Sequence, residues 1–108
     1  MNRESVGEFE QLVLLAILRV GEDAYGVPIL EEIRARTGRT VLRPAVYVAL
    51  RRLEEKGLVR SREGEGPPER GGRPRKLYRV EPQGLELLRD ARRALFSMWD
   101  GLQSALDG

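Results

Sequence analysis

The sequence predicts a small, mainly helical α+β fold, and three observations carry this prediction. Residues 41–57 have the apolar periodicity of a short helix and end at a glycine. Residues 58–62 and 77–80 then read as two strands, with a segment rich in Gly and Pro between them. Residues 82–108 return to helical periodicity. With two helical segments before it, this order predicts a winged helix-turn-helix over residues 1–81, with a two-stranded wing, followed by a long C-terminal helix.

Length and composition bound what the chain can do. With 108 residues and a mass of 12.2 kDa, it is one small domain, alone or with an appended helix. A core of this size is marginal, so association with a second copy would be a natural supplement. The sequence has no cysteine and no histidine, which excludes disulfides, histidine metal sites and catalysis by either residue. We expect no cofactor.

The charged residues favour a nucleic acid as partner. The formal net charge is only +2, but the pI is about 9.4, and Lys56 and Lys76 are the only lysines among 19 basic residues. Arginine keeps its charge and presents a planar fork that fits phosphate groups and guanine edges, although genome base composition would explain the same preference. The longest apolar run, residues 12–18, is too short to span a bilayer. We therefore expect a cytoplasmic protein.

Two helices are predicted before residue 41. The first, residues 6–20, is apolar around most of its circumference, so it is either a central core helix or a core helix with one side in a dimer interface. It ends at Gly21, and Asp23 is predicted to cap the second helix, which ends at Thr37 and Gly38. The core-facing stripe of the second helix contains Tyr25, Ile29, Leu30 and Ile33. The arginines near its end, either solvated beside the helix dipole or in contact with phosphates, are Arg34, Arg36 and Arg39.

The third helix is predicted from its spacing and its ends. Val46, Leu50 and Leu53 lie at i, i+4 and i+7, which places them on one face. Pro44 suits the first turn, where the N–H group that it lacks would have no partner, and Gly57 suits the end, where positive φ is common. The opposite face bears small, apolar and charged side chains: Pro44, Ala45, Val48, Arg51, Arg52 and Glu55. Such a face can approach base-pair edges without crowding them.

The segment between the two strands, residues 63–74, is too rich in Gly and Pro to pack a core, and we expect it to project as a loop. Acidic residues predominate in its first part, whereas the charged residues near its end and just after it are all basic. The basic residues there are Arg70, Arg73, Arg75 and Lys76. This composition fits a solvated loop tip, but we favour a wing whose basic end lies on the sugar-phosphate backbone or in the minor groove.

Residues 82–106 predict one long helix with an apolar stripe. Its a/d register, of alternating three- and four-residue spacing, contains Leu85, Leu88, Leu95, Trp99, Leu102 and Leu106. Arg92 stands where the series expects an apolar residue. Such a helix would be about 36 Å long, longer than so small a domain can cover. Its stripe therefore needs a partner, and the simplest partner is a second copy of the chain.

Five short motifs occur one after another along the sequence. They are an apolar run in the first helix, a Tyr-Gly pair opening the second, a Leu-Glu-Glu-Lys-Gly-Leu-Val run ending the third, a basic run in the wing, and Pro-Gln-Gly opening the last helix. In this sequence they fall within residues 12–18, 24–29, 46–59, 71–80 and 82–84. Each segment alone is weak evidence, but in this order and at this spacing they resemble the PadR family of bacterial and archaeal transcription regulators.

The resemblance implies a homodimer that binds palindromic operators and usually represses transcription. In short members, a single C-terminal helix packs with the first helix of the other subunit, and several members release DNA on binding small aromatic or hydrophobic compounds. The resemblance also places Tyr47 and Lys76 near DNA. Two sites depart from the family: Leu42 and Arg43 stand where a Ser or Thr would cap the third helix, and Glu81 replaces a common Thr. Each departure weakens capping by about 1 kcal/mol.

The candidate DNA-binding residues lie on the third helix and the wing. They are Arg43, Ala45, Tyr47, Val48, Arg51, Arg52, Arg70, Arg73, Arg75 and Lys76. Arg51 and Arg52 are long enough to reach a base or a phosphate, and Ala45 and Val48 could contact a thymine methyl group.

Residues at the edges of these faces have two interpretations. Arg43 and Tyr47 are better placed for phosphates, but Tyr47 could equally be a half-buried packing residue.

Phe96 and Trp99 are either ordinary interface packing or the lining of a pocket for a planar effector. The predicted dimer interface, where residues 82–108 form the dimerisation helix, contains Leu12, Leu15, Leu88, Leu95, Trp99, Leu102 and Leu106.

Two other classes of function remain open. A winged helix can serve as a protein-interaction module, whose affinity for DNA would be weak and purely electrostatic; salt dependence and the ratio of specific to random binding discriminate the two. A hydrolytic enzyme would need paired carboxylates such as Glu54 and Glu55, but adjacent residues on a helix point about 100° apart and do not converge on one substrate. We therefore expect no enzymatic activity.

Overall fold

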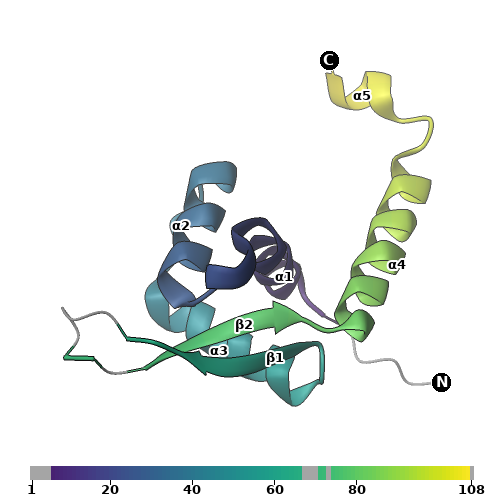
Figure 1. The fold of residues 1–108 in the computed structure, drawn as a ribbon. Coiled ribbons are helices and arrows are strands. Elements are labelled where there is room, and N and C mark those ends of the chain that lie inside the picture. The colour runs from purple at the N-terminus through teal and green to yellow at the C-terminus, as the bar shows by residue number, and fades with distance from the viewer. Residues whose placement is uncertain (1–5, 67–70, 73, 108) are drawn as a thin grey trace.

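Helices and a two-stranded hairpin follow one another in the predicted order (Figure 1). The structure is a computed structural model that describes residues 6–66, 71, 72 and 74–107. Its elements are α1 (Glu8–Val20), the short 3-10 helix η1 (Gly21–Asp23), α2 (Gly26–Thr37), α3 (Arg43–Glu55), β1 (Val59–Gly64), β2 (Arg75–Val80), α4 (Pro82–Trp99) and α5 (Gln103–Asp107). The predicted winged helix-turn-helix is therefore confirmed.

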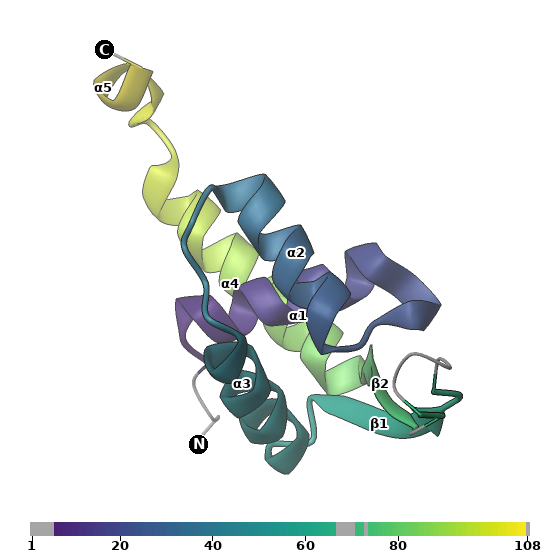
Figure 2. The same ribbon diagram turned by 90° about the vertical axis from the view of Figure 1, so that its left-hand side faces the viewer.

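Helices α1, α2 and α3 pack against one another, and the β hairpin lies against α1, α3 and η1 (Figure 2). Helix α4 leaves the base of the hairpin and extends beyond the three-helix bundle, with α5 at its far end (Figure 1). The wing projects from the opposite side of the molecule. Within the described residues, no helix combines the length and the apolar composition that a membrane span requires.

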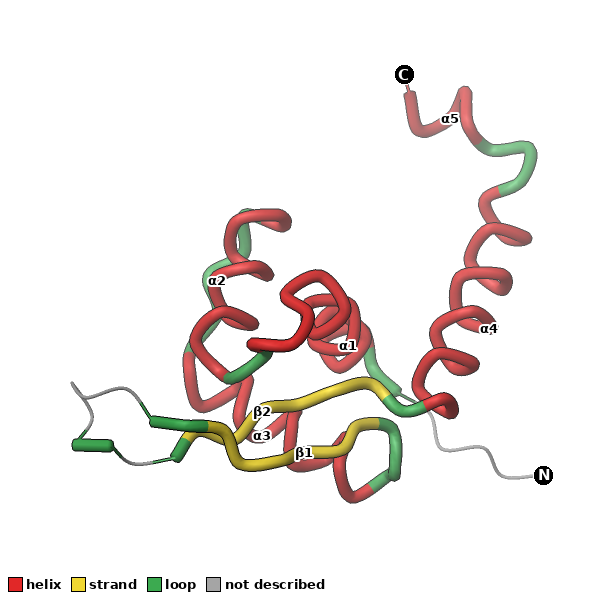
Figure 3. The backbone as a smooth tube through the Cα atoms, viewed as in Figure 1, coloured by secondary structure: helices red, strands yellow, loops and turns green. Residues whose placement is uncertain are grey.

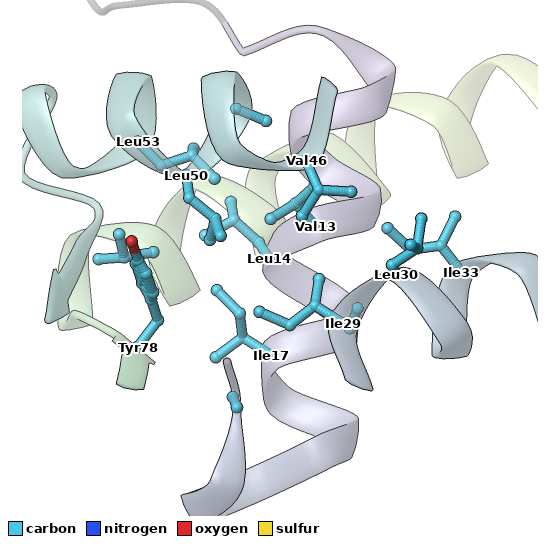
Figure 4. Packing of buried hydrophobic residues seen from close by; sticks show 14 of the residues in the cluster. Val13, Leu14, Ile17, Ile29, Leu30, Ile33, Val46, Leu50, Leu53 and Tyr78 are labelled. Carbon is cyan, nitrogen blue, oxygen red and sulfur yellow. The ribbon is translucent and has the colours of Figure 1, made fainter. Parts of the chain in front are cut away.

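The core consists mainly of aliphatic side chains from the three helices, joined by Tyr78 of β2, as Figure 4 shows, and by Ala24, Val41, Leu58 and Val59. The largest side chains that are fully buried are Leu14, Ile29, Leu50, Leu53, Val13 and Val46. Burial of each such side chain stabilises the fold by about 1.5–3 kcal/mol. The core-facing side predicted for the third helix is therefore confirmed. In α2, Ile29, Leu30 and Ile33 are buried as predicted, whereas Tyr25 is only partly buried.

The start of α2 differs from the prediction that Asp23 caps it. Asp23 is the last residue of η1, and the cap position is Tyr25, whose side chain makes no capping hydrogen bond. The Tyr78 N–H group of β2 donates to the Ala24 carbonyl over 2.8 Å. Because this hydrogen bond ties Ala24 to the strand, the helix begins later than an Asp23 cap requires. The end of α2 is as predicted, at Gly38 with φ of 70°.

The two strands pair antiparallel along their whole length, which makes the wing longer than predicted (Figure 3). The expectation that the loop starts at Glu63 is wrong, because Glu63 and Gly64 pair with Lys76 and Arg75. The side chain of Leu77 packs over Gly64, where a β-carbon would lie 2.5 Å from Leu77 Cδ1. The ladder therefore continues through residues whose composition alone suggested a loop.

Helix α4 is fixed to the base of the wing by its first turn. The Glu81 N–H group donates to the Leu58 carbonyl over 2.9 Å. Gly84 is buried there, and a β-carbon at this position would lie 2.6 Å from the same carbonyl oxygen. The predicted lack of capping is confirmed, since neither Leu42 before α3 nor Glu81 before α4 makes a side-chain cap.

The prediction of one continuous helix over residues 82–106 is wrong. Helix α4 ends at Trp99, and the chain turns at Gly101, whose φ is 84°, before α5 begins. Glycine adopts this left-handed conformation at little cost, so Gly101 permits the break that the apolar spacing concealed. Leu102 and Leu106 lie beyond the break and do not continue the stripe of α4 along one helix.

Candidate nucleic-acid interface

Helix α3 turns one face to the core and the opposite face to solvent. Its buried side contains Val46, Leu50 and Leu53. The side chains exposed on its outer face are the predicted ones: Pro44, Ala45, Val48, Arg51, Arg52 and Glu55. The helix therefore presents a narrow surface with two small apolar side chains between charged ones.

The arginines at the end of α2 have partners within the protein. Arg34 donates from Nε and Nη2 to the Val41 carbonyl, over 3.1 and 2.6 Å, and so braces the turn into α3. Arg36 pairs with a carboxylate of its own helix, and Arg39 lies 2.9 Å from a carboxylate oxygen of Glu8 in α1. Arg34 is exposed in the last turn of α2, as the first of the two predicted roles requires, and its guanidinium also bonds to backbone.

The arginines of α3 have no such partners. Arg43, Arg51 and Arg52 are exposed, and none of them forms an ion pair or a side-chain hydrogen bond with any residue that the structure describes. A guanidinium without an internal carboxylate keeps its full charge and all its donors for an external anion or base edge. These three side chains are therefore available to an external anion on the outer face of α3.

Tyr47 lies at the junction of α2 and α3. Its side chain is 46% exposed, and its ring passes over Gly26, the first residue of α2. A β-carbon at residue 26 would lie 2.5 Å from the Tyr47 hydroxyl oxygen. One edge of the ring thus packs between the helices while the rest faces solvent, so the structure combines both interpretations of this residue: half-buried, and open to a partner.

The wing is joined to α3 through Glu54. Ser61 Oγ of β1 donates to Glu54 Oε2 over 2.6 Å, and Lys76 Nζ of β2 lies 3.5 Å from Glu54 Oε1. The hydrogen bond from Ser61 and the charge of Lys76 lower the pKa of Glu54 against an opposing effect of burial. Burial, together with the nearby Glu54, raises the pKa of Tyr78. The sequence did not predict this cluster of Glu54, Ser61 and Lys76. The one local signal was that Glu54 shares a helical face with Tyr47, seven residues earlier.

The predicted basic residues of the wing differ in their surroundings. Lys76 is exposed beside Glu54, as described above. The Arg75 guanidinium carbon lies 4.2 Å from the centroid of the Tyr25 ring, and the Arg75 Nε is buried without a hydrogen-bond partner among the described residues. A cation–π contact of this kind holds Arg75 against the protein and leaves fewer of its donors for DNA. Arg70 and Arg73 lie outside the described residues.

Helix α4 carries exposed apolar side chains along the side that faces α1. Leu88 and Leu12 are partly buried and pack against the hydrophobic core. The apolar side chains that stay exposed on α1, α4 and α5 include Leu15, Leu18, Leu95, Phe96, Met98, Trp99, Leu102 and Leu106. Several of these side chains, Leu15, Leu18, Leu95, Phe96 and Trp99, gather around one hollow, and apolar surface gathered in this way is typical of an interaction site.

An open hollow of about 590 Å³ lies between α1 and α4. Leu15 and Leu18 line it from α1, and Phe96 and Trp99 line it from α4. Half of the Trp99 side chain is exposed, at 49%. The structure therefore brings together the two aromatic residues that the sequence singled out.

An exposed helix with unpaired arginines, braced by a preceding helix and flanked by a β hairpin, defines the class of the protein: a winged helix-turn-helix DNA-binding protein. The profile of the transcriptional regulator PadR-like family matches residues 14–90. Because the match covers more than half of the 108 residues, the chain belongs to the PadR family of transcriptional regulators. The resemblance noted in the sequence is confirmed, and the protein is a regulator and not an enzyme.

Solved structures with the same fold agree with this membership. A PadR family transcriptional regulator from Eggerthella lenta DSM 2243 is 32% identical, with a TM-score of 0.68 over 92% of this chain and 86% of that chain. A PadR-like regulator from Bacillus cereus strain ATCC 14579 is 21% identical, with a TM-score of 0.72 over 93% and 92%. One from Clostridium difficile R20291 is 22% identical, with a TM-score of 0.70 over 91% and 98%. The last two show the fold alone. No curated protein sequence matches the chain significantly.

Proposed function

We propose that the protein is a cytoplasmic repressor that binds a palindromic operator as a homodimer. The observation that carries the proposal is the outer face of α3, where Arg43, Arg51 and Arg52 are exposed and have no partner within the described residues. The family membership supplies DNA binding and transcription regulation. Operator symmetry, repression and the residue roles below are our inference.

Helix α3 enters the major groove in this proposal. A B-DNA major groove is about 12 Å wide and admits a helix, so the exposed face of α3 would meet base edges. Arg51 and Arg52 then reach guanine or phosphate, and Ala45 and Val48 contact thymine methyl groups. Arg43, in the first turn of α3, faces the phosphate backbone.

The side chains at the two flanks of α3 complete the proposed interface. Tyr47 contacts a phosphate with the exposed part of its side chain, and the wing follows the backbone with Lys76. Arg70 and Arg73 would extend this contact, and Arg75 would contribute less because it stacks on Tyr25. Phosphate contacts of this kind set the position of the protein on the duplex and add little sequence information.

Residues 82–108 form the dimerisation segment in this proposal, and residues 1–81 the DNA-binding domain. Leu15 of α1 and Leu95 and Trp99 of α4 are about half exposed, at 44%, 56% and 49%. Covering them with α1 and α4 of a second copy would remove this apolar surface from water. A two-fold axis between the copies presents two α3 helices to the duplex, and so implies an operator with two inverted half-sites.

The hollow between α1 and α4 is the proposed site of a small aromatic or hydrophobic effector that releases DNA. Support comes from its largely apolar lining, which also includes Gln11, Arg89 and Arg92, and from Phe96 and Trp99, since planar ligands stack on aromatic rings. Trp99 is the single tryptophan of the chain, so its fluorescence reports directly on this site. Quenching by an aromatic compound, accompanied by loss of operator binding, is expected. Unchanged fluorescence across a broad panel would assign both rings to ordinary interface packing.

Selection of bound sequences from a random DNA pool tests the main proposal. We expect an enriched palindrome whose half-sites lie about 10 base pairs apart or a multiple of that, bound at least about 1,000-fold more tightly than random DNA. Transcription from a promoter that overlaps the palindrome should fall when the protein is added. A pool without enrichment, bound weakly and only at low salt, would instead favour a protein-interaction module.

A further inference from the structure

The contact between α3 and the wing supports an inference that rests on the proposed DNA-binding function and goes beyond it. We infer that Glu54 is a positioning residue: it sets the wing against α3 and so contributes to operator specificity without touching DNA. Its partners are Ser61 of β1 and Lys76 of β2, one on each strand of the wing.

The first support is the place of Glu54 on α3. Tyr47, Arg51 and Glu54 stand at i, i+4 and i+7, so they share one face of the helix. The Tyr47 ring is packed over Gly26 at one end of this stripe, and Glu54 is bonded to the wing at the other. Arg51 lies between these two anchored residues and has no side-chain partner among the residues that the structure describes. The position of the wing relative to α3 therefore determines the surroundings of Arg51, the side chain best placed to read a base.

The second support is the geometry of the wing. Ser61 pairs with Tyr78 across the hairpin, and alternate residues of a strand share a face, so Ser61, Lys76 and Tyr78 project to the same side. Ser61 binds one carboxylate oxygen of Glu54, at 2.6 Å, and Lys76 approaches the other, at 3.5 Å. A single carboxylate thus connects both strands to the helix that would enter the groove.

The two contacts of Glu54 differ in strength. A hydrogen bond of 2.6 Å from a hydroxyl to a carboxylate is strong for its kind, whereas an ion pair with an exposed lysine contributes little. The side chain of Lys76 is 61% exposed. Glu54 can therefore keep its hydrogen bond to Ser61 and hold β1 in place while Lys76 turns to a phosphate. The wing is preorganised before DNA arrives, which lowers the entropic cost of binding.

This role predicts an effect opposite in sign to simple electrostatics. Removal of a carboxylate from a surface that meets DNA raises affinity for every sequence, because one repulsive charge is lost. Loss of a positioning contact lowers affinity for the operator and leaves affinity for random DNA unchanged or higher. Glu55 is the matched control, since it is the adjacent carboxylate and is exposed on α3 without a hydrogen bond or ion pair to the described part of the wing.

The test compares variants of the full chain on the selected operator and on random DNA, after thermal melting has shown that each variant is folded. Glu54→Ala should weaken operator binding by about tenfold, the effect of a loosened binding element. Ser61→Ala should act in the same direction, and the double variant should lose no more than Glu54→Ala. Glu54→Gln keeps an acceptor for Ser61 and should lose less. Glu55→Ala, which removes only a negative charge, should bind the operator and random DNA more tightly by similar factors.

Operator binding by Glu54→Ala that equals or exceeds the parent's would overturn the inference, as would an equal loss on operator and random DNA. Independent, additive effects of Glu54→Ala and Ser61→Ala would also contradict it. If Glu54→Ala fails to fold, Glu54→Gln and Ser61→Ala carry the same comparison. Failure of the parent itself to select an operator would contradict the proposed function and the inference together, so the two failures are distinguishable.

Discussion

The hydroxyl oxygen of Tyr47 lies over Gly26, so close that a β-carbon at residue 26 would be 2.5 Å away from it. Two ring carbons of Tyr47 would be 2.7 Å from the same β-carbon. Gly26→Ala should therefore push the half-exposed ring outward, and because alanine also favours the helix over glycine by up to about 1 kcal/mol, the free energy of unfolding should fall by no more than about 1 kcal/mol. Urea unfolding measures the loss. Adding Tyr47→Ala should make the double variant less destabilised than the sum of the two single changes.

Replacement of Arg51 by Ala tests direct readout. The side chain is exposed and unpaired within the described residues, so its removal should cost the folded protein little. Operator binding should weaken by about 1–3 kcal/mol, and selection with the variant should show relaxed preference at one position of each half-site. Arg36→Ala is the control, because Arg36 pairs within α2 and has no place in the proposed interface. Unaltered selection by Arg51→Ala would remove Arg51 from the interface.

Replacement of Arg43 by Ala tests a phosphate contact. Arg43 is exposed in the first turn of α3 and has no partner among the described residues. The variant should bind operator and random DNA more weakly by similar factors, and the slope of log affinity against log salt should fall by about 1. A loss confined to the operator would show instead that Arg43 reads a base. Titration of operator and of random DNA, each at several salt concentrations, distinguishes the two results.

Periodicity predicted the helices well wherever burial on one side governs them. Val46, Leu50 and Leu53 of α3 are fully buried, and the exposed face opposite them is the predicted one. Propensity failed where a distant segment decides the local structure. Tyr78 of β2 holds Ala24 by a hydrogen bond, and this contact, which joins residues far apart in the chain, moves the start of α2 away from Asp23.

The candidate site could be predicted only in part, for a related reason. Exposure of the α3 arginines follows from helical spacing, which is local. The contacts of Arg34 with Val41, of Arg75 with Tyr25 and of Glu54 with Ser61 depend on how elements pack in three dimensions. Residue type alone marks each of these side chains as charged and able to reach solvent or DNA, and does not show which will be held within the protein.

The glycine at the break after α4 makes the effect of one added methyl group, in Gly101→Ala, predictable. Gly101 has φ of 84°, and a β-carbon there would meet no atom within 4 Å, so the obstacle to alanine is conformational rather than steric crowding from neighbours. A non-glycine residue in this region costs about 1–2 kcal/mol, and alanine is the best helix former. Gly101→Ala should therefore favour a helix that continues from α4 into α5. Circular dichroism should show more helix; an unchanged spectrum would mean that the flanking residues enforce the turn.

Charge placed on the exposed stripe of α4 tests the proposed dimer. Leu95 is 56% exposed and faces the hollow shared with α1, so Leu95→Glu would place a carboxylate in the apolar contact between two copies. Burial of an unpaired charge is costly, and dissociation avoids that cost. Sedimentation should therefore show a dimer for the parent and a monomer for the variant. Leu42→Glu is the matched control for sedimentation, because Leu42 is 66% exposed just before α3, outside the proposed dimer interface. A monomeric Leu95→Glu variant should also lose operator affinity, since one half-site contact no longer supports the other; a variant that remains dimeric would place the interface elsewhere.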